Sequence, residues 1–238
     1  MRVRLVPHAA MTAILLAGVW LSGAVPDWLA GSAIAASAKA DVAGTAETAK
    51  GATTADPLQE FIDRTRSASG SFTQQVLRDG HVIETSSGRF AFERPDRFDW
   101  EVQEPFEQRL VADGQRLYFY DRDLAQVTIR PLHDALASTP AAVLFGHGEL
   151  RDDVSVHRLP AQDGVQRIEI VPRNPETGFQ RVEAGFRDGL PVWMRVDDAF
   201  GRVVRFEFRN IVSNPPLPPD RFRFEVPPGT DVIEAQGR

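Results

Sequence analysis

The chain contains no cysteine among its 238 residues. Exported proteins often rely on disulfides, so here the apolar core alone must hold the fold. Bacterial lipoproteins are acylated on a cysteine that directly follows the signal peptide, and this chain has no cysteine to acylate. The mature protein therefore cannot be anchored to a membrane in that way.

A long apolar run is also missing. The apolar stretch from about Ala9 to Val25 is shorter than the roughly 20 residues that span a bilayer, and Thr12 and Ser22 interrupt it. Arg2 and Arg4 precede this stretch, and small residues follow it. The order of charged, apolar and small residues is typical of a secretory signal peptide. An uncleaved membrane anchor is the alternative interpretation.

Residues 1–40 are the predicted signal peptide. The tripeptide Ala38-Lys39-Ala40 has the small residues that precede a cleavage site, which predicts cleavage before Asp41. Ala33-Ile34-Ala35 and Ala36-Ser37-Ala38 are rival sites with the same pattern. We therefore expect a mature protein that is secreted and soluble.

Basic residues are in the minority. The 27 Lys and Arg are outnumbered by 33 Asp and Glu, which gives a formal net charge of −6. Residues 1–40 contain more basic than acidic residues, so the predicted mature chain is more acidic still. Nucleic acid and anionic membrane surfaces both require a basic footprint on their partner. The composition argues against both partners.

Recognisable catalytic motifs are absent as well. The sequence has neither a His-Glu-x-x-His zinc pattern nor a Gly-x-Ser-x-Gly nucleophile elbow. His133 and Asp134 are adjacent in a predicted helix and so point apart, and Gly146-His147-Gly148 is too short for a phosphate loop. Glu93 and Asp96 flank a predicted turn, where carboxylates are usually solvated. We therefore expect no catalytic residues, no metal site and no cofactor, and a protein that is not an enzyme.

The chain that follows the signal peptide divides into a leader and one domain. Residues 41–55 are almost all Ala, Gly, Thr, Asp, Glu and Lys, so this segment has little to bury and is predicted to be flexible. The domain is predicted to cover residues 56–238. Asp56 is a suitable N-cap and Pro57 a suitable first helical residue, which predicts a helix at the start of the domain.

Aromatic residues alternate with charged ones between Gly88 and Tyr120. Phe98 and Trp100 alternate with Asp99 and with other charged residues, which predicts strands with an aromatic face and a charged, solvated face. Pro95 interrupts the pattern where a hairpin turn is expected. The aromatic face must be covered by another sheet, by helices or by a ligand.

Most of the remaining chain also has the period of strands. Turn signals at Asp113-Gly114, Asp163-Gly164 and Asp188-Gly189 have hairpin spacing. A predicted helical interruption, broken at Thr139-Pro140, separates the strands into two groups. Strands are predicted at residues 71–77, 88–93, 97–102, 108–111, 116–121, 126–130, 154–159, 165–171, 179–186, 191–197, 203–211 and 222–226.

Regularly spaced strands with a few apolar helices favour a mainly β fold with a helical lid. A closed barrel packed with its own side chains needs no helices. We therefore expect an incomplete, strongly curved antiparallel β-barrel whose concave aromatic face is capped by helices.

Several segments together resemble the LolA family of periplasmic lipoprotein carriers. The matching segments occur in the family's order from about residue 57 to about residue 234, which is most of the predicted mature chain. They are Ser71–Gln74, Glu93–Trp100, Leu110–Gly114, Leu117–Asp121, Thr139–Ala141 and Phe222–Gly229.

The resemblance implies roles for particular residues. In this family the arginine of the Arg-Pro pair, here Arg94, hydrogen-bonds the backbone of the lid and holds the empty cavity closed. The lid would contain Leu132, Leu136, Val143, Leu144 and Phe145. The acyl-chain cavity would be lined by Phe72, Phe90, Phe92, Phe98, Trp100, Leu117 and Phe119.

The resemblance also implies a function and partners. A monomeric carrier would bind the acyl chains of lipoproteins released by an inner-membrane ABC transporter complex and deliver them to an outer-membrane receptor. That receptor shares the fold but is itself acylated on a cysteine, so the absence of cysteine favours the carrier. The alternative is an envelope-stress sensor of the same fold that detects mislocalised lipoproteins. Such sensors usually have a second domain, whereas this chain ends soon after its last predicted strand.

Overall fold

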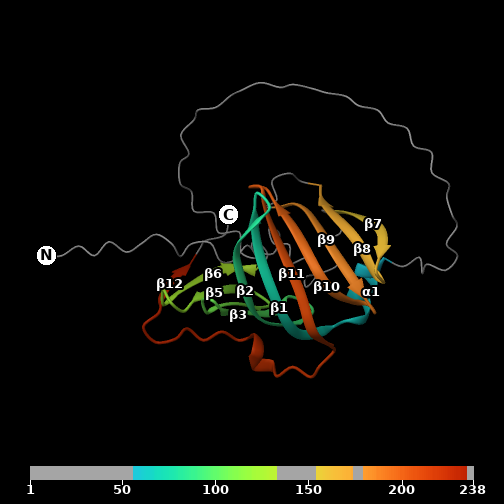
Figure 1. Cartoon of the computed structure of the whole chain (residues 1–238). Coiled ribbons are helices and arrows are strands. Elements are labelled where there is room, and N and C mark those ends of the chain that lie inside the picture. Colours follow the sequence, from blue (N-terminus) through green and yellow to red (C-terminus); the bar gives the residue numbers. More distant parts are fainter. Residues whose placement is uncertain (1–55, 133–153, 174–178, 235–238) are drawn as a thin grey trace, which may run out of the picture. The chain divides into compact units, whose positions relative to one another are not determined.

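The computed structural model describes residues 56–132, 154–173 and 179–234 (Figure 1). The predicted signal peptide and leader lie outside these residues. The elements are α1 (Pro57–Arg64), β1 (Ser67–Arg78), β2 (His81–Glu93), β3 (Arg97–Glu104), β4 (Gln108–Asp113), β5 (Arg116–Asp121), β6 (Gln126–Pro131), β7 (Val154–Gln162), β8 (Val165–Pro172), β9 (Phe179–Arg187), β10 (Leu190–Asp198), β11 (Arg202–Ser213), the 3-10 helix η2 (Pro219–Phe222) and β12 (Asp231–Glu234).

The described strands form one sheet in the order β12-β6-β5-β4-β3-β2-β1-β11-β10-β9-β8-β7. Strand β1 joins the two halves, because it pairs with its sequence neighbour β2 on one side and with β11 on the other. The sheet is open and strongly curved (Figure 1). The predicted mainly β class and curvature are confirmed. The pairs are antiparallel except for β12, which pairs with β6 in parallel.

Local signals place α1 and several turns where the sequence predicts them. The side chain of Asp56 accepts a hydrogen bond from the backbone N–H of Leu58, at 3.0 Å, and Pro57 is the first helical residue. Two-residue turns at Asp163-Gly164 and Asp188-Gly189 have positive φ at both positions, as type I′ hairpin turns require. These predictions are confirmed. A third turn of this kind, at Asp79-Gly80, connects β1 to β2. Strand β2 therefore begins at His81 and is longer than the predicted strand at residues 88–93.

The predicted strand at residues 222–226 is wrong. Residues 215–230, here called the C-terminal segment, include η2 but add no strand to the sheet. Phe222 instead ends the 3-10 helix η2, which begins with Pro219, and residues 223–230 pair with no strand of the sheet. The alternation of Phe222 and Phe224 reflects packing on the sheet instead: Phe222 is buried, and Phe224 stacks on Tyr118 with the ring centroids 5.4 Å apart.

We call the face of the sheet opposite the apolar core the convex face, and the C-terminal segment covers part of it. Asp99, predicted to be solvated, is buried there and accepts a hydrogen bond from Arg109 at 2.8 Å. Its second oxygen lies 3.4 Å from Nε of Arg221 on the C-terminal segment. The hydrogen bond to Asp99 raises the pKa of Arg109. The charged face of β3 is therefore not fully solvated.

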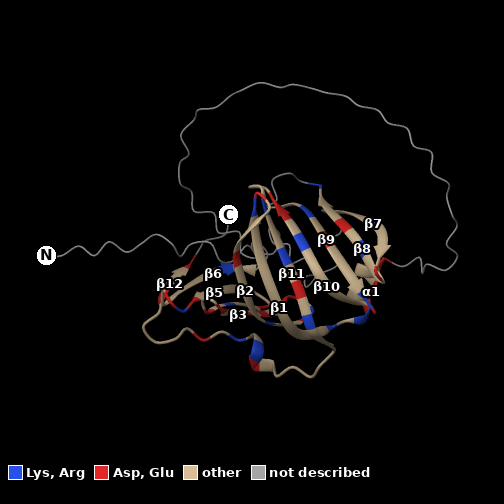
Figure 2. Ribbon diagram, viewed as in Figure 1, with Lys and Arg blue, Asp and Glu red and all other residues tan. Residues whose placement is uncertain are grey.

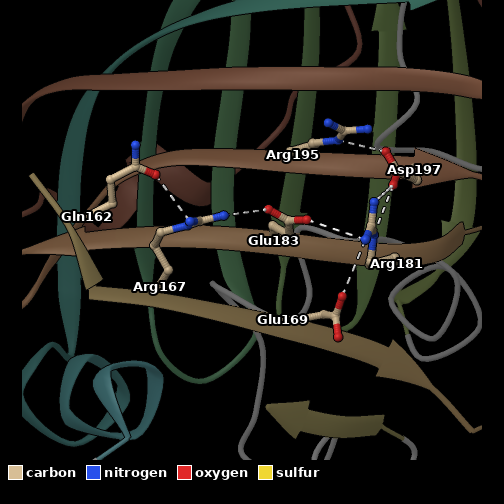
Figure 3. Close-up of polar contacts among 7 residues, drawn as sticks. All are labelled: Gln162, Arg167, Glu169, Arg181, Glu183, Arg195 and Asp197. Atoms are coloured by element: carbon tan, nitrogen blue, oxygen red, sulfur yellow. Dashed lines mark hydrogen bonds and ion pairs between the residues drawn. The ribbon is translucent and has the colours of Figure 1, made fainter. Parts of the chain in front are cut away.

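Paired charges cover the convex face of β8, β9 and β10 (Figures 2 and 3). The guanidinium of Arg181 lies 2.6 Å from Asp197 and 3.4 Å from Glu169. Arg195 lies 2.9 Å from the other oxygen of Asp197. Because these charges neutralise one another across three strands, this face presents no patch of a single sign.

Asp197 links this network to the pH dependence of stability. Burial alone raises the pKa of Asp197, but hydrogen bonds from Arg181 and Arg195 outweigh burial, so the pKa lies below its usual value. A carboxylate with a lowered folded-state pKa stabilises the fold above its unfolded pKa of about 3.9, and the stabilisation is lost as the pH falls through the folded pKa.

We predict that Asp197→Asn lowers the free energy of unfolding near pH 6 and that the difference from wild type shrinks as the pH falls below about 4. Urea denaturation across this pH range measures it. Glu207→Gln, in an exposed pair with Arg209 on β11, is the control and should have little effect at any pH. A wild-type-minus-variant difference that is constant with pH would contradict the assignment.

Candidate functional site

The predicted cavity residues lie on one face of the curved sheet. The strand register places Phe92 opposite Phe98 and Phe90 opposite Trp100, so their side chains share that face. We call it the concave face, because it carries the apolar core of the sheet. The predicted residues buried there are Phe72, Phe90, Phe92, Trp100 and Leu117, while Phe98 and Phe119 are partly buried and pack against them.

The aromatic rings on this face lie close to the backbone. Phe72 stacks on Trp100 with the ring centroids 3.9 Å apart and the planes at 26°. Phe72 can lie flat because its partner across the strands is Gly88. A Cβ atom at Gly88 would lie 1.9 Å from the carbonyl oxygen of Glu101 and 3.0 Å from the ring of Phe72. Only glycine fits at this position.

Two aromatic residues of this cluster were not predicted as cavity residues. Phe206 lies edge-on to Trp100, with centroids 5.8 Å apart, and Phe208 lies edge-on to Phe90 at 5.7 Å. Both are on β11, which reaches the cluster by pairing with β1. Their alternation with charged residues predicts a strand, but only the long-range pairing shows which face they share.

Helix α1 packs on the concave face. Its Phe61 is 1% exposed and contacts Phe92 on β2 and Phe186 on β9, each with centroids 6.1 Å apart. Leu58, one turn earlier on the same helical face, is also buried. A single short helix therefore lies across strands from both halves of the sheet.

Arg94 connects the β2–β3 turn to the carboxyl end of α1. Its Nε donates a hydrogen bond to the carbonyl oxygen of Thr65, the C-cap of α1, at 3.0 Å. The guanidinium also lies 5.0 Å from the ring centroid of Phe92 and 5.5 Å from that of Phe61. Burial lowers the pKa of Arg94 to about 10, so the side chain stays charged near neutral pH. Arg94 thus contacts a helix that covers the aromatic face.

Asn214 holds the same end of α1 from the opposite side of β1. Its Oδ1 accepts hydrogen bonds from the backbone N–H of Arg66 at 2.8 Å and of Ser67 at 3.3 Å. Its Nδ2 donates to the carbonyl oxygen of Arg64 at 2.9 Å. No sequence pattern pointed to Asn214, because its partners lie about 150 residues away along the chain. Its φ of 52° lies in the left-handed region, which Asn tolerates better than most residues.

The predicted lid residues lie mostly outside the described residues. Leu132 is buried and belongs to the hydrophobic core. Leu136, Val143, Leu144 and Phe145 are not described. In the ranges that the structure describes, no group of three His, Asp or Glu side chains could hold a metal ion, and no helix there is long and apolar enough to cross a membrane.

Comparisons with known proteins show which family the chain resembles. The family model described as "Outer membrane lipoprotein carrier protein LolA" matches residues 63–225. The outer-membrane lipoprotein carrier protein of Cupriavidus necator is 45% identical over 183 residues, which cover 75% of this chain and 87% of that protein. The carrier protein of the same name from Bordetella avium is 42% identical over 180 residues, covering 75% of this chain and 86% of that protein.

A solved structure shows the same fold. An uncharacterized conserved protein from Thermus thermophilus superposes with a TM-score of 0.50 over 76% of this chain and 100% of that chain, at 14% identity. At this identity the likeness concerns the fold alone. The family model and the relatives above 40% identity establish more: this chain belongs to the LolA family of outer membrane lipoprotein carrier proteins.

Proposed function

We propose that this chain is a soluble periplasmic carrier that binds the acyl chains of lipoproteins on its concave aromatic face. The observation that carries the proposal is the packing of Phe61 and Arg94 on the aromatic rings of that face. The face is aromatic, and among the described residues a helix rather than a second sheet packs on it. Membership of the carrier family supports acyl chains as the ligand.

A cover that can move gives the carrier a suitable affinity. At about 0.8 kcal/mol per methylene, one chain of about 15 methylenes gives about 12 kcal/mol of transfer free energy. Three such chains would exceed the limit of about 18–21 kcal/mol that non-covalent complexes reach. If the apolar face is covered in the empty protein, binding competes with the cover and the net affinity falls by the opening free energy. Release to a receptor then becomes possible.

The proposed cover consists of α1 and the helical segment predicted to contain Leu136, Val143, Leu144 and Phe145. Arg94 would hold the cover closed through the carboxyl end of α1. The proposed partners are an inner-membrane ABC transporter complex that loads the protein and an outer-membrane receptor that accepts the cargo. The carrier itself would act as a monomer and without catalysis.

We predict that the full-length protein is processed near residues 35–40 and is recovered from the soluble periplasmic fraction. Mass spectrometry of the native protein should then identify co-purifying lipoproteins and subunits of the transporter. Recovery at full precursor mass in salt-washed membranes would contradict the carrier. Co-purification of a transmembrane anti-sigma factor in place of lipoproteins would favour the envelope-stress sensor.

We predict that Arg94→Leu tightens acyl binding about 10- to 100-fold, because a charge-assisted hydrogen bond is worth about 1.5–3 kcal/mol and would be lost from the closed form alone. The variant should accept cargo and fail to transfer it to the receptor. Displacement of a fluorescent acyl probe measures the affinity, and a reconstituted transfer assay measures the hand-off.

Arg97→Leu is the matched control for this test. Arg97 follows the same turn, but its pair with Glu93 is exposed, so its loss should change neither binding nor transfer. If Arg94→Leu loads and transfers like wild type, Arg94 does not hold the cover closed.

A further inference from the structure

Buried polar side chains gather at one end of the concave face. Gln74 lies opposite Ser86 and Phe206, and Gln108 lies opposite Asp121 and Val102. The four polar residues, here called the polar band, lie toward the β1–β2, β3–β4 and β5–β6 turns, away from the β2–β3 turn that carries Arg94. The polar band consists of Gln74, Ser86, Gln108 and Asp121.

The polar band adjoins the aromatic cluster directly. Gln108 shares its face of β4 with Leu110, two residues on. Leu110 in turn lies opposite Trp100 on β3 and Phe119 on β5. A ligand that lies along the aromatic rings would therefore meet polar atoms at one end and α1 at the other. This arrangement suits a molecule with apolar chains and a polar head.

The amide of Gln108 has one fixed orientation. Its Nε2 donates a hydrogen bond to Oδ2 of Asp121 at 2.8 Å, and a carboxylate only accepts, so the nitrogen is the atom that faces β5. Asp121 is itself held in place, because its Oδ1 accepts a hydrogen bond from the backbone N–H of Leu124 at 3.0 Å. The amide oxygen of Gln108 must therefore point away from Asp121.

That oxygen is a buried acceptor without a donor. Gln108 is 7% exposed, and its Oε1 has no hydrogen-bond partner among the described residues. The side chain opposite Gln108 on β3, Val102, is apolar and buried. Such unsatisfied atoms are rare in native proteins and call for an explanation. Since the oxygen is already removed from water, a ligand that donates an N–H gains a hydrogen bond without a further desolvation cost for the oxygen.

We propose that Oε1 of Gln108 accepts an N–H group from the acylated amino terminus of a lipoprotein. The inference rests on the proposed function and adds an orientation: the polar head lies at the polar band and the acyl chains extend over Trp100 toward α1. An N-acylated amino terminus has an amide N–H at the base of an acyl chain, whereas the ester and thioether groups of its S-linked diacylglyceryl chains have only acceptors. The subsite would therefore bind the amide in preference to these ester groups.

The wild-type protein tests this with two ligands that differ by one group. The first is an N-palmitoyl, S-dipalmitoylglyceryl cysteine methyl ester, whose only N–H is the amide. In the second, an oxygen replaces that N–H. We expect the amide to displace a fluorescent acyl probe at a concentration about 5- to 10-fold lower, as one additional hydrogen bond to a buried acceptor gives. Equal displacement by both ligands would overturn the proposal.

The variant Gln108→Met tests the residue. Methionine retains the length of the side chain and lacks the acceptor, so we expect the variant to bind the two ligands with equal affinity. Its affinity for the ester should be the same as that of the wild-type protein. Gln126→Met is the matched control, since Gln126 lies opposite Asp121 on the far side from Gln108. It should keep the wild-type preference for the amide.

The outcomes separate this inference from the proposed function. If neither ligand displaces the probe from the folded wild-type protein, the proposed binding of lipoprotein acyl chains is wrong. If both bind and the preference survives in Gln108→Met, the subsite lies elsewhere and the inference fails while the carrier stands. Should Gln108→Met fail to fold, judged by circular dichroism, the two-ligand comparison on wild type decides.

Discussion

A single curved sheet cannot bury its own concave face, and this constraint determines much of the structure. Sandwiches solve the problem with a second sheet, and closed barrels fill their interior with side chains from all sides. Among the described residues α1 supplies part of the cover, and its Phe61 contacts Phe92 and Phe186 from opposite halves of the sheet. A helix of eight residues has little stability of its own, so its position depends on these contacts and on its attachment to the sheet.

The carboxyl end of α1 has two attachments of different character. Asn214 binds the backbone on both sides of Thr65 and fixes where the chain enters β1. Arg94 instead combines one hydrogen bond with two ring contacts: Phe61 belongs to α1, and Phe92 belongs to the face that a ligand would occupy. An acyl chain on the rings would compete with Arg94 and leave the contacts of Asn214 in place. In this account Asn214 retains the helix while Arg94 controls the cover.

The sequence predicts features that depend on near neighbours. Alternation identified the strands around Phe98 and Trp100, and Asp-Gly pairs identified the turns, because both signals are set by local backbone geometry. The sequence did not identify Phe206 as part of the aromatic cluster or Asn214 as an anchor of α1, because both roles depend on the pairing between β1 and β11. Alternation also predicted a strand at residues 222–226 that is not there: this segment packs on the sheet without joining it.

Tryptophan fluorescence tests the central claim, that acyl chains bind the concave face. Outside the predicted signal peptide the chain has two tryptophans: Trp100 on the concave face, and Trp193, which lies across Gly185 on the convex face. A brominated acyl chain quenches indoles that it contacts. The account predicts strong quenching in Trp193→Phe, which retains only Trp100, and little in Trp100→Phe. Quenching of Trp193 alone, or of neither residue when the chain is bound, would contradict it.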